Sequence, residues 1–147
     1  MRESNYLFST ADLSSALEAQ GKKATSAVAS MQKDHFLSTT VDTLVEHLIA
    51  EYVVVPLSLD EQGISMDHAE AKVNVTGDFR YGGYHDGRPM HVDGHTLKFY
   101  IPFTGNSELW RLRPSTWSTS PPSADIDIPA SRLVIAFTNT SNTESDW

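Results

Sequence analysis

Three histidines and two aspartates lie within residues 85–95, and these side chain types can hold a metal ion. Imidazole and carboxylate groups bind Zn²⁺ and similar ions when three or four of them converge. His91, Asp93 and His95 are the candidate ligands, and on a helix the spacing of the two histidines would place both rings on one face. Asp93-Gly94 instead predicts the turn of a β-hairpin, which puts His91 and His95 on opposite sides of the ribbon. We therefore expect a polar hairpin tip, without a metal or cofactor.

Acid–base chemistry is the second interpretation of this part of the chain. His85 and Asp86 lie close to two tyrosines in a glycine-rich loop, and they are candidates for a general base and its supporting carboxylate. Adjacent residues rarely point in the same direction, and the chain has no Gly-x-Ser-x-Gly or His-Glu-x-x-His motif. A small metal-dependent or His/Asp-based hydrolase is therefore an alternative and not the preferred function.

Aromatic and arginine side chains gather in two loops, and these residue types dominate binding hot spots. In an extended chain, Arg111 and Arg113 project on one side and Trp110 and Leu112 on the other. An anionic ligand, an acidic peptide or a single-stranded nucleic acid fits such a surface. The alternative is that Trp110 and Leu112 belong to the core, while the arginines pair with surface carboxylates. The predicted partner-binding residues are Tyr81, Tyr84, Arg88, Trp110, Arg111, Arg113 and Trp117.

One helix is predicted strongly, from Thr40 to Glu51, with Thr39 as its N-cap. We expect its apolar side to cover one face of a sheet. The segment 9–31 is rich in Ala and Ser and has a weaker helical pattern that Gly21 interrupts. A helical hairpin, a partner-docking helix and a frayed arm all fit this segment. The apolar stripe of the strong helix comprises Val41, Leu44, Val45, Leu48, Ile49 and Tyr52.

The apolar period changes from helical to alternating near Tyr52. Residues 52–59 predict a strand that ends at Pro56, and residues 71–76 predict a half-buried strand with Ala71 and Val73 on one face. Further strands are expected at 90–92, 96–101, 124–128 and 133–137, the last two forming a closing hairpin. The strand at 96–101 is expected to alternate, with Leu97, Phe99 and Ile101 on one face. Helices that precede strands joined by turns predict an α+β fold. We expect N-terminal helices packed on a mainly antiparallel sheet or a partly closed β-sandwich.

The organisation along the chain follows from these elements. Residues 1–33 are predicted to form a helical arm or hairpin, residues 34–137 an α+β globular domain, and residues 138–147 a polar tail or linker. The chain of 147 residues is long enough for one sizeable core.

Composition narrows the classes of function. The absence of cysteine removes disulfides and thiolate chemistry and fits a reducing compartment. No apolar run is long enough to span a membrane and no signal peptide is evident, so we expect a cytoplasmic protein. The net charge of −8 disfavours general binding to nucleic acid.

Four phrases of the sequence together resemble an N-terminal β-rich module of larger bacterial proteins that lack an assigned function. They are residues 56–60, 73–78, 101–105 and 109–116, and the resemblance extends over about residues 36–137. Some of those proteins look like components of anti-phage defence. The resemblance implies that this chain is one module beside an effector or interaction domain, and it transfers no catalytic residue.

The sequence thus favours a non-catalytic module for recognition or assembly, with a protein partner or an adjoining effector domain. Its expected contact surface is the loop 79–89 together with residues 110–117. A structural subunit that self-associates through the N-terminal helices is a further alternative.

Overall fold

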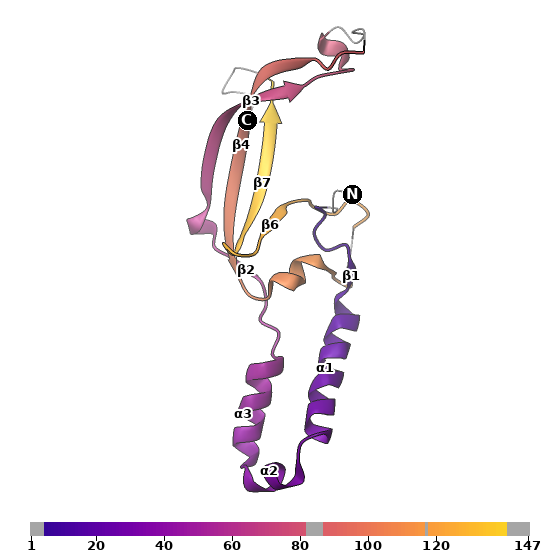
Figure 1. The fold of residues 1–147 in the computed structure, drawn as a ribbon, viewed down its shortest axis with the longest axis vertical. Coiled ribbons are helices and arrows are strands. Elements are labelled where there is room, and N and C mark those ends of the chain that lie inside the picture. The colour runs from indigo at the N-terminus through magenta and orange to yellow at the C-terminus, as the bar shows by residue number, and fades with distance from the viewer. Residues whose placement is uncertain (1–4, 82–86, 117, 141–147) are drawn as a thin grey trace. The chain divides into compact units, whose positions relative to one another are not determined.

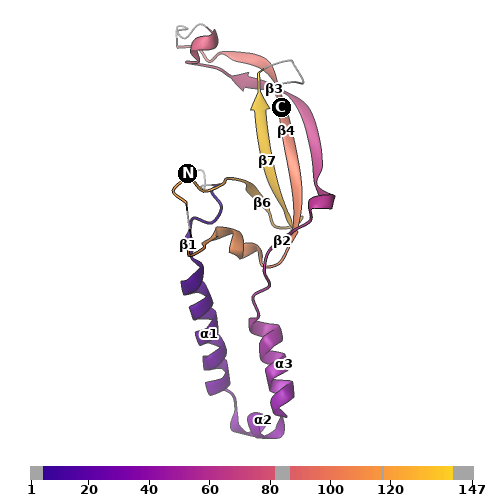
Figure 2. The same cartoon turned by 180° about the vertical axis from the view of Figure 1, so that it is seen from behind.

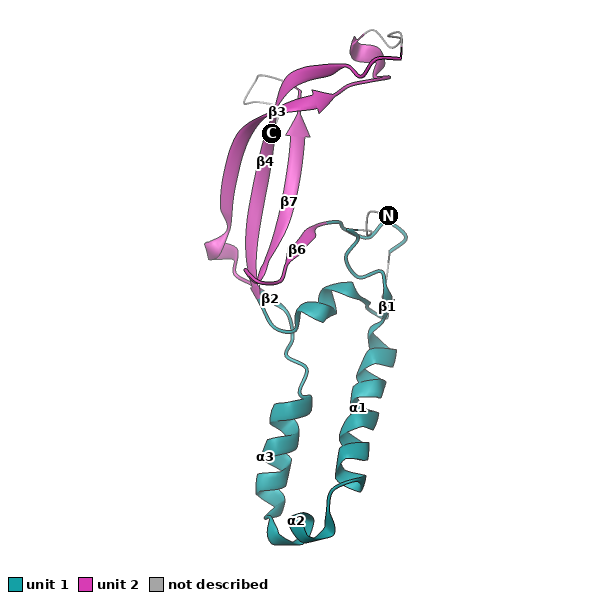
Figure 3. Cartoon of the chain, in the orientation of Figure 1, with its two compact units in different colours: residues 1–58, 104–123 teal, residues 59–103, 124–147 magenta. Residues whose placement is uncertain are grey.

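The computed structural model describes residues 5–81, 87–116 and 118–140. These residues have the predicted α+β fold, with three α-helices, a mainly antiparallel five-stranded sheet and a small parallel strand pair (Figure 1). The chain divides into two compact units, of which unit 1 comprises residues 1–58 and 104–123 and unit 2 comprises residues 59–103 and 124–147 (Figure 3). The predicted boundary at residue 33 falls at the start of a short helix within unit 1.

Unit 1 contains a helical hairpin, but it is not the hairpin predicted within residues 9–31, because residues 13–29 form a single helix. Helix α1 (Leu13–Ala29) and helix α3 (Val41–Tyr52) contact one another and run antiparallel, and the short helix α2 (Lys33–Ser38) connects them (Figures 1 and 2). The side-chain amide of Gln20 donates a hydrogen bond to the carbonyl of Tyr52 at 3.1 Å. The expected interruption at Gly21 is wrong, because α1 continues through that residue and one glycine costs a helix only about 1 kcal/mol.

Helix α3 has nearly the bounds that its apolar stripe predicts. Its N-cap is Thr40 and not Thr39, since the Thr40 hydroxyl accepts a hydrogen bond from the backbone N–H of Thr43 at 3.3 Å. The predicted strand at 52–59 is wrong over most of its length. Tyr52 ends the helix, and regular strand structure is confined to β2 (Ser58–Leu59).

The chain between α3 and β2 is fixed by the turn that contains Gly105. The N–H of Val55 bonds the side-chain oxygen of Asn106 at 3.0 Å, and the N–H of Asn106 bonds the carbonyl of Val55 at 3.0 Å. Gly105 has φ = +102°, and a Cβ there would lie 2.2 Å from the carbonyl oxygen of Pro56. The β-branched residues 53–55 therefore form a hydrogen-bonded connection without strand partners of their own.

The remainder of unit 1 packs around Trp110. A 3₁₀ helix (Ser107–Arg111) leads into β5 (Leu112–Arg113), which pairs in parallel with β1 (Ala11–Asp12). The alternation of side chains that an extended chain would give therefore does not apply as far as Arg111. Trp110 is buried and its ring lies 5.5 Å from that of Phe8.

Unit 2 is built on one long central strand, β4 (His91–Thr104). Strand β3 (Ser65–Asn74) pairs with it antiparallel along its first ten residues, and β7 (Arg132–Asn139) pairs with it antiparallel from His95 to Pro102. Strand β6 (Asp125–Asp127) forms the predicted hairpin with β7, and β2 is also a neighbour of β4. Strand β7 extends two residues into the segment predicted to be a polar tail.

The predicted hairpin turn at Asp93-Gly94 is wrong. Both residues lie inside the continuous strand β4, where Gly94 pairs with Ala71 of β3. A Cβ on Gly94 would lie 2.5 Å from the carbonyl oxygen of Asn139, so the glycine permits a close approach of chains and not a turn. Because side chains alternate along a strand, His91 and His95 lie on the same face, contrary to the sequence expectation.

The core of unit 2 follows the predicted alternation along β4. Leu97 and Phe103 are buried, Phe99 and Ile101 are half-buried, and Leu133 of β7 is buried opposite Ile101. The packing of a helix on this sheet stays a prediction. None of the helices in the described ranges is both long enough and apolar enough to cross a membrane.

Candidate interaction surfaces

Helix α3 exposes half of the apolar stripe that the sequence assigned to a buried interface. Val41, Val45 and Ile49 are 72%, 47% and 58% exposed, whereas Leu44 is 9% exposed. Leu48 and Tyr52 are half-buried, so the row that begins at Leu44 faces α1. At 3.6 residues per turn, the exposed row lies roughly 60° around α3 from the row facing α1.

Helix α1 has an exposed apolar row in the equivalent position. No residue of α1 is buried, and its most covered positions mark the side that faces α3. Leu17 and Val28 are exposed, and they lie roughly 70° around α1 from that side. The half-covered positions are Leu13, Ala16, Gln20, Ala24 and Ala27.

The two exposed rows lie on the same side of the helical hairpin. Viewed along its own axis from the N-terminus, each helix has its exposed row displaced in the same rotational direction from the side that meets the other helix. Two antiparallel helices are related by a two-fold axis that is perpendicular to the plane containing both helix axes. Equal displacement therefore brings both rows to one surface. We call this surface the hairpin face, and it comprises Leu17, Val28, Val41, Val45 and Ile49.

Carboxylates border the hairpin face along α3. Asp42 and Glu46 follow the outer edge of the exposed row, and α3 contains no lysine or arginine. On α1 the corresponding edge has Glu18, which pairs with Lys22 at 2.9 Å. At the end of α3, partial burial and the neighbouring carboxylate of Glu51 raise the pKa of Tyr52. The hairpin face is thus apolar at its centre and acidic along the α3 edge.

The predicted aromatic and arginine residues have different environments. Trp110 belongs to the core of unit 1 and Arg113 pairs with Asp12 at 3.1 Å, which confirms the alternative interpretation for these two residues. Arg111 of unit 1 is exposed. In unit 2, Arg88 is exposed and the Tyr81 hydroxyl hydrogen-bonds that of Thr140 at 2.6 Å. The binding role of this set stays a prediction, and Tyr84 and Trp117 lie outside the described residues.

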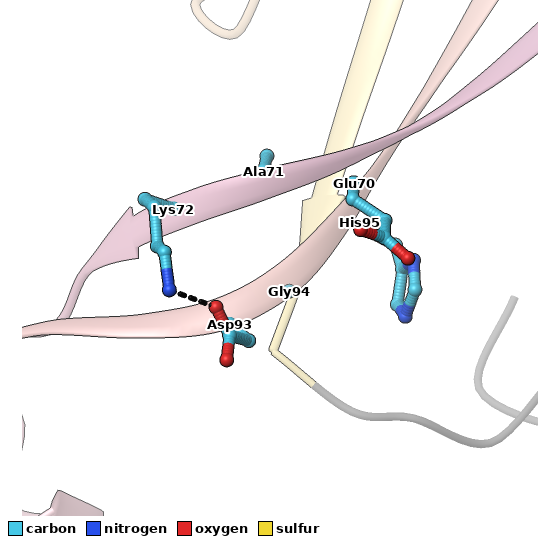
Figure 4. A pocket seen from close by; sticks show the side chains of 6 residues that line it. All are labelled: Glu70, Ala71, Lys72, Asp93, Gly94 and His95. Atoms are coloured by element: carbon cyan, nitrogen blue, oxygen red, sulfur yellow. Dashed lines mark hydrogen bonds and ion pairs between the residues drawn. The ribbon is translucent and has the colours of Figure 1, made fainter.

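A pocket of about 340 Å³ lies on the β3–β4 ladder of unit 2 (Figure 4). Lys72 of β3 forms an ion pair with Asp93 of β4, and Glu70 is the register partner of His95. The remaining lining residues are Ala71 and Gly94.

His95 is the least satisfied polar side chain of this pocket. Its Nδ1 is buried and has no hydrogen-bond partner within the described part of the chain, and its ring stacks on that of His68 with centroids 4.9 Å apart. Sequence reasoning selected Asp93 and His95, but it missed Glu70, Lys72 and His68. Those three become neighbours only through the β3–β4 register, and no local signal predicts them.

The enzymatic candidates of the sequence are not assembled by the described residues. Among these residues, no group of three or more His, Asp or Glu side chains converges as metal ligands. His91 pairs in register with Asn74. His85 and Asp86 lie outside the described residues.

Comparison of the chain with known protein families, with curated proteins and with solved structures found no match.

Proposed function

We propose that this chain is a non-catalytic assembly module that binds a protein partner through the hairpin face. The observation that carries the proposal is the exposure of Val41, Val45 and Ile49 on a helix whose only buried residue is Leu44. Contiguous apolar surface of this kind on a folded protein marks interaction sites. Burying the exposed part of each of these side chains would contribute about 1 kcal/mol.

The proposal places the main contact on the helices and not on the loops 79–89 and 110–117. Two of the seven loop residues predicted to bind a partner have structural roles inside unit 1, namely Trp110 and Arg113. The exposed side chains Arg88 and Arg111 stay predicted secondary contacts.

The wider setting follows from the sequence. In this proposal the chain is part of a larger bacterial protein or complex, as the resemblance in residues 36–137 implies, and anti-phage defence is the process that this resemblance suggests. The cysteine-free composition supports a cytoplasmic setting.

The double substitution Val45→Glu/Ile49→Glu tests the proposal. Both side chains are exposed, so we expect the variant to keep its circular dichroism spectrum and its thermal midpoint. We expect it to lose the association that the parent chain shows in light scattering or in chemical cross-linking of its native complex. Ile64→Glu/Met66→Glu is the matched control, because it places the same charges on exposed apolar positions of unit 2. Retention of every parental association by the hairpin variant would contradict the proposal.

A further inference from the structure

We infer that the occupant of the hairpin face is an amphipathic helix of a protein partner, with an apolar stripe flanked by lysine or arginine. This inference rests on the proposed function and adds the chemistry of the partner. The hairpin face consists of two adjacent apolar rows on antiparallel helices. Such a surface accepts a third helix that presents apolar side chains at positions i, i+3 or i+4, and i+7.

The dimensions of the hairpin face set the length of the partner helix. Helix α3 has 12 residues and α1 has 17. At 1.5 Å per residue these helices are about 18 and 25 Å long. A partner helix of about 12–17 residues matches this length.

The acidic side chains that border the hairpin face favour a partner helix whose apolar stripe has basic flanks. Asp42 and Glu46 lie along the α3 edge of a helix that has no lysine or arginine and whose His47 pairs with Glu51, and Glu18 lies along the α1 edge beside Lys22. A partner with basic flanks places its cations against these carboxylates, and complementary potentials of this kind set specificity and association rate.

The same charges disfavour the other occupants. A second copy of this chain that packed α3 on α3 would bring Asp42 and Glu46 of both copies together, and each copy also has a net charge of −8. An anionic membrane surface or a nucleic acid would meet the same acidic edge. Of the partners with an apolar surface, the structure therefore favours an amphipathic helix with basic flanks.

The experiment uses the full chain and three synthetic peptides of about 16 residues in fluorescence anisotropy. The first has leucines in a helical stripe flanked by lysines, the second has the same leucines flanked by glutamates, and the third has the lysine peptide's composition in scrambled order. We expect the chain to bind the lysine-flanked peptide at least roughly tenfold more tightly than either of the other two.

Two double variants, each with a matched control in unit 2, locate the binding. Val45→Glu/Ile49→Glu is expected to lose roughly tenfold or more in affinity for the lysine-flanked peptide, whereas Ile64→Glu/Met66→Glu retains it. Asp42→Lys/Glu46→Lys is expected to invert the preference, so that the glutamate-flanked peptide binds more tightly. Glu61→Lys/Asp67→Lys makes the same change in net charge on exposed residues of unit 2 and is expected to keep the parental preference.

The outcomes separate this inference from the proposed function. Absence of binding to the lysine-flanked peptide, or a preference that Asp42→Lys/Glu46→Lys leaves unchanged, overturns the basic helix. Light scattering that finds a dimer sensitive to Val45→Glu/Ile49→Glu also overturns it, while leaving the assembly function in place. The assembly function fails separately if substitution of the hairpin face alters no association of the chain.

Discussion

At the scale of single residues, glycines have opposite roles in the two units. Gly94 lies in a crowded part of the sheet, where an added Cβ would be 2.5 Å from the carbonyl oxygen of Asn139 and 2.7 Å from a methyl group of Val73. Gly21 lies in an exposed part of α1, where an added Cβ would meet nothing within 4 Å. Substitution of each glycine by alanine therefore tests these two environments.

Gly94→Ala is expected to destabilise the protein by about 1–3 kcal/mol, because neither the backbone of Asn139 nor strand β3 can move without disturbing the ladder. The measurement is the midpoint of urea unfolding followed by fluorescence. An unchanged midpoint would contradict the close approach of β7 to Gly94.

Asp78 and Arg80 form a local ion pair at 2.7 Å, and the Arg80 side chain lowers the pKa of the Asp78 carboxyl. A carboxyl whose pKa is lower in the folded state contributes stability above its unfolded pKa. That contribution is lost as the pH falls through the folded pKa. We expect Arg80→Gln to return the Asp78 pKa towards the ordinary aspartate value, which an NMR titration of the carboxyl carbon would measure. An unchanged pKa in Arg80→Gln would show that the ion pair is not its cause.

At the scale of elements, α3 illustrates how much an apolar pattern determines. The apolar stripe predicted the helix and came close to its observed bounds. Residues three and four apart are neighbours on one face of a helix, and this does not depend on what packs against that face. The stripe did not indicate which half of it would be covered. Leu44, Leu48 and Tyr52 face α1, while Val41, Val45 and Ile49 remain exposed.

Gly21→Ala tests the continuity of α1. Alanine is favoured over glycine inside a helix by about 0.5–1 kcal/mol, and the site has room for the methyl group. We expect a higher thermal midpoint and slightly greater helicity by circular dichroism. A lower midpoint would indicate that α1 bends or ends at Gly21, as the sequence pattern suggested.

At the scale of the whole molecule, the chain has its exposed apolar hairpin face in one unit and its long-stranded sheet in the other. The hairpin face belongs to unit 1, and the five-stranded sheet, apart from Ser58 of β2 and Thr104 of β4, belongs to unit 2. We expect substitutions on the hairpin face to affect association, and substitutions such as Gly94→Ala to affect stability. This separation is why the unit 2 variants are suitable controls for the hairpin variants.

The sequence by itself determined the α+β class, helix α3 and the alternation along β4. Each depends on a short-range period that the backbone imposes on neighbouring side chains. It misassigned Asp93-Gly94, because an Asp-Gly pair is a turn signal only where the flanking segments pair with each other. In this fold β3 pairs with β4 across that site, and the pairing of β7 with β4 begins at the next residue, His95.

Only the tertiary structure decided which residues meet. The register of β3 on β4 brings Glu70 and His68 to His95, and the pairing of α1 with α3 leaves Val45 and Ile49 exposed. Such contacts join residues far apart in the sequence, and they depend on how whole elements pair. A local sequence pattern indicates which face of a helix or strand is apolar, but it does not indicate which other element covers that face.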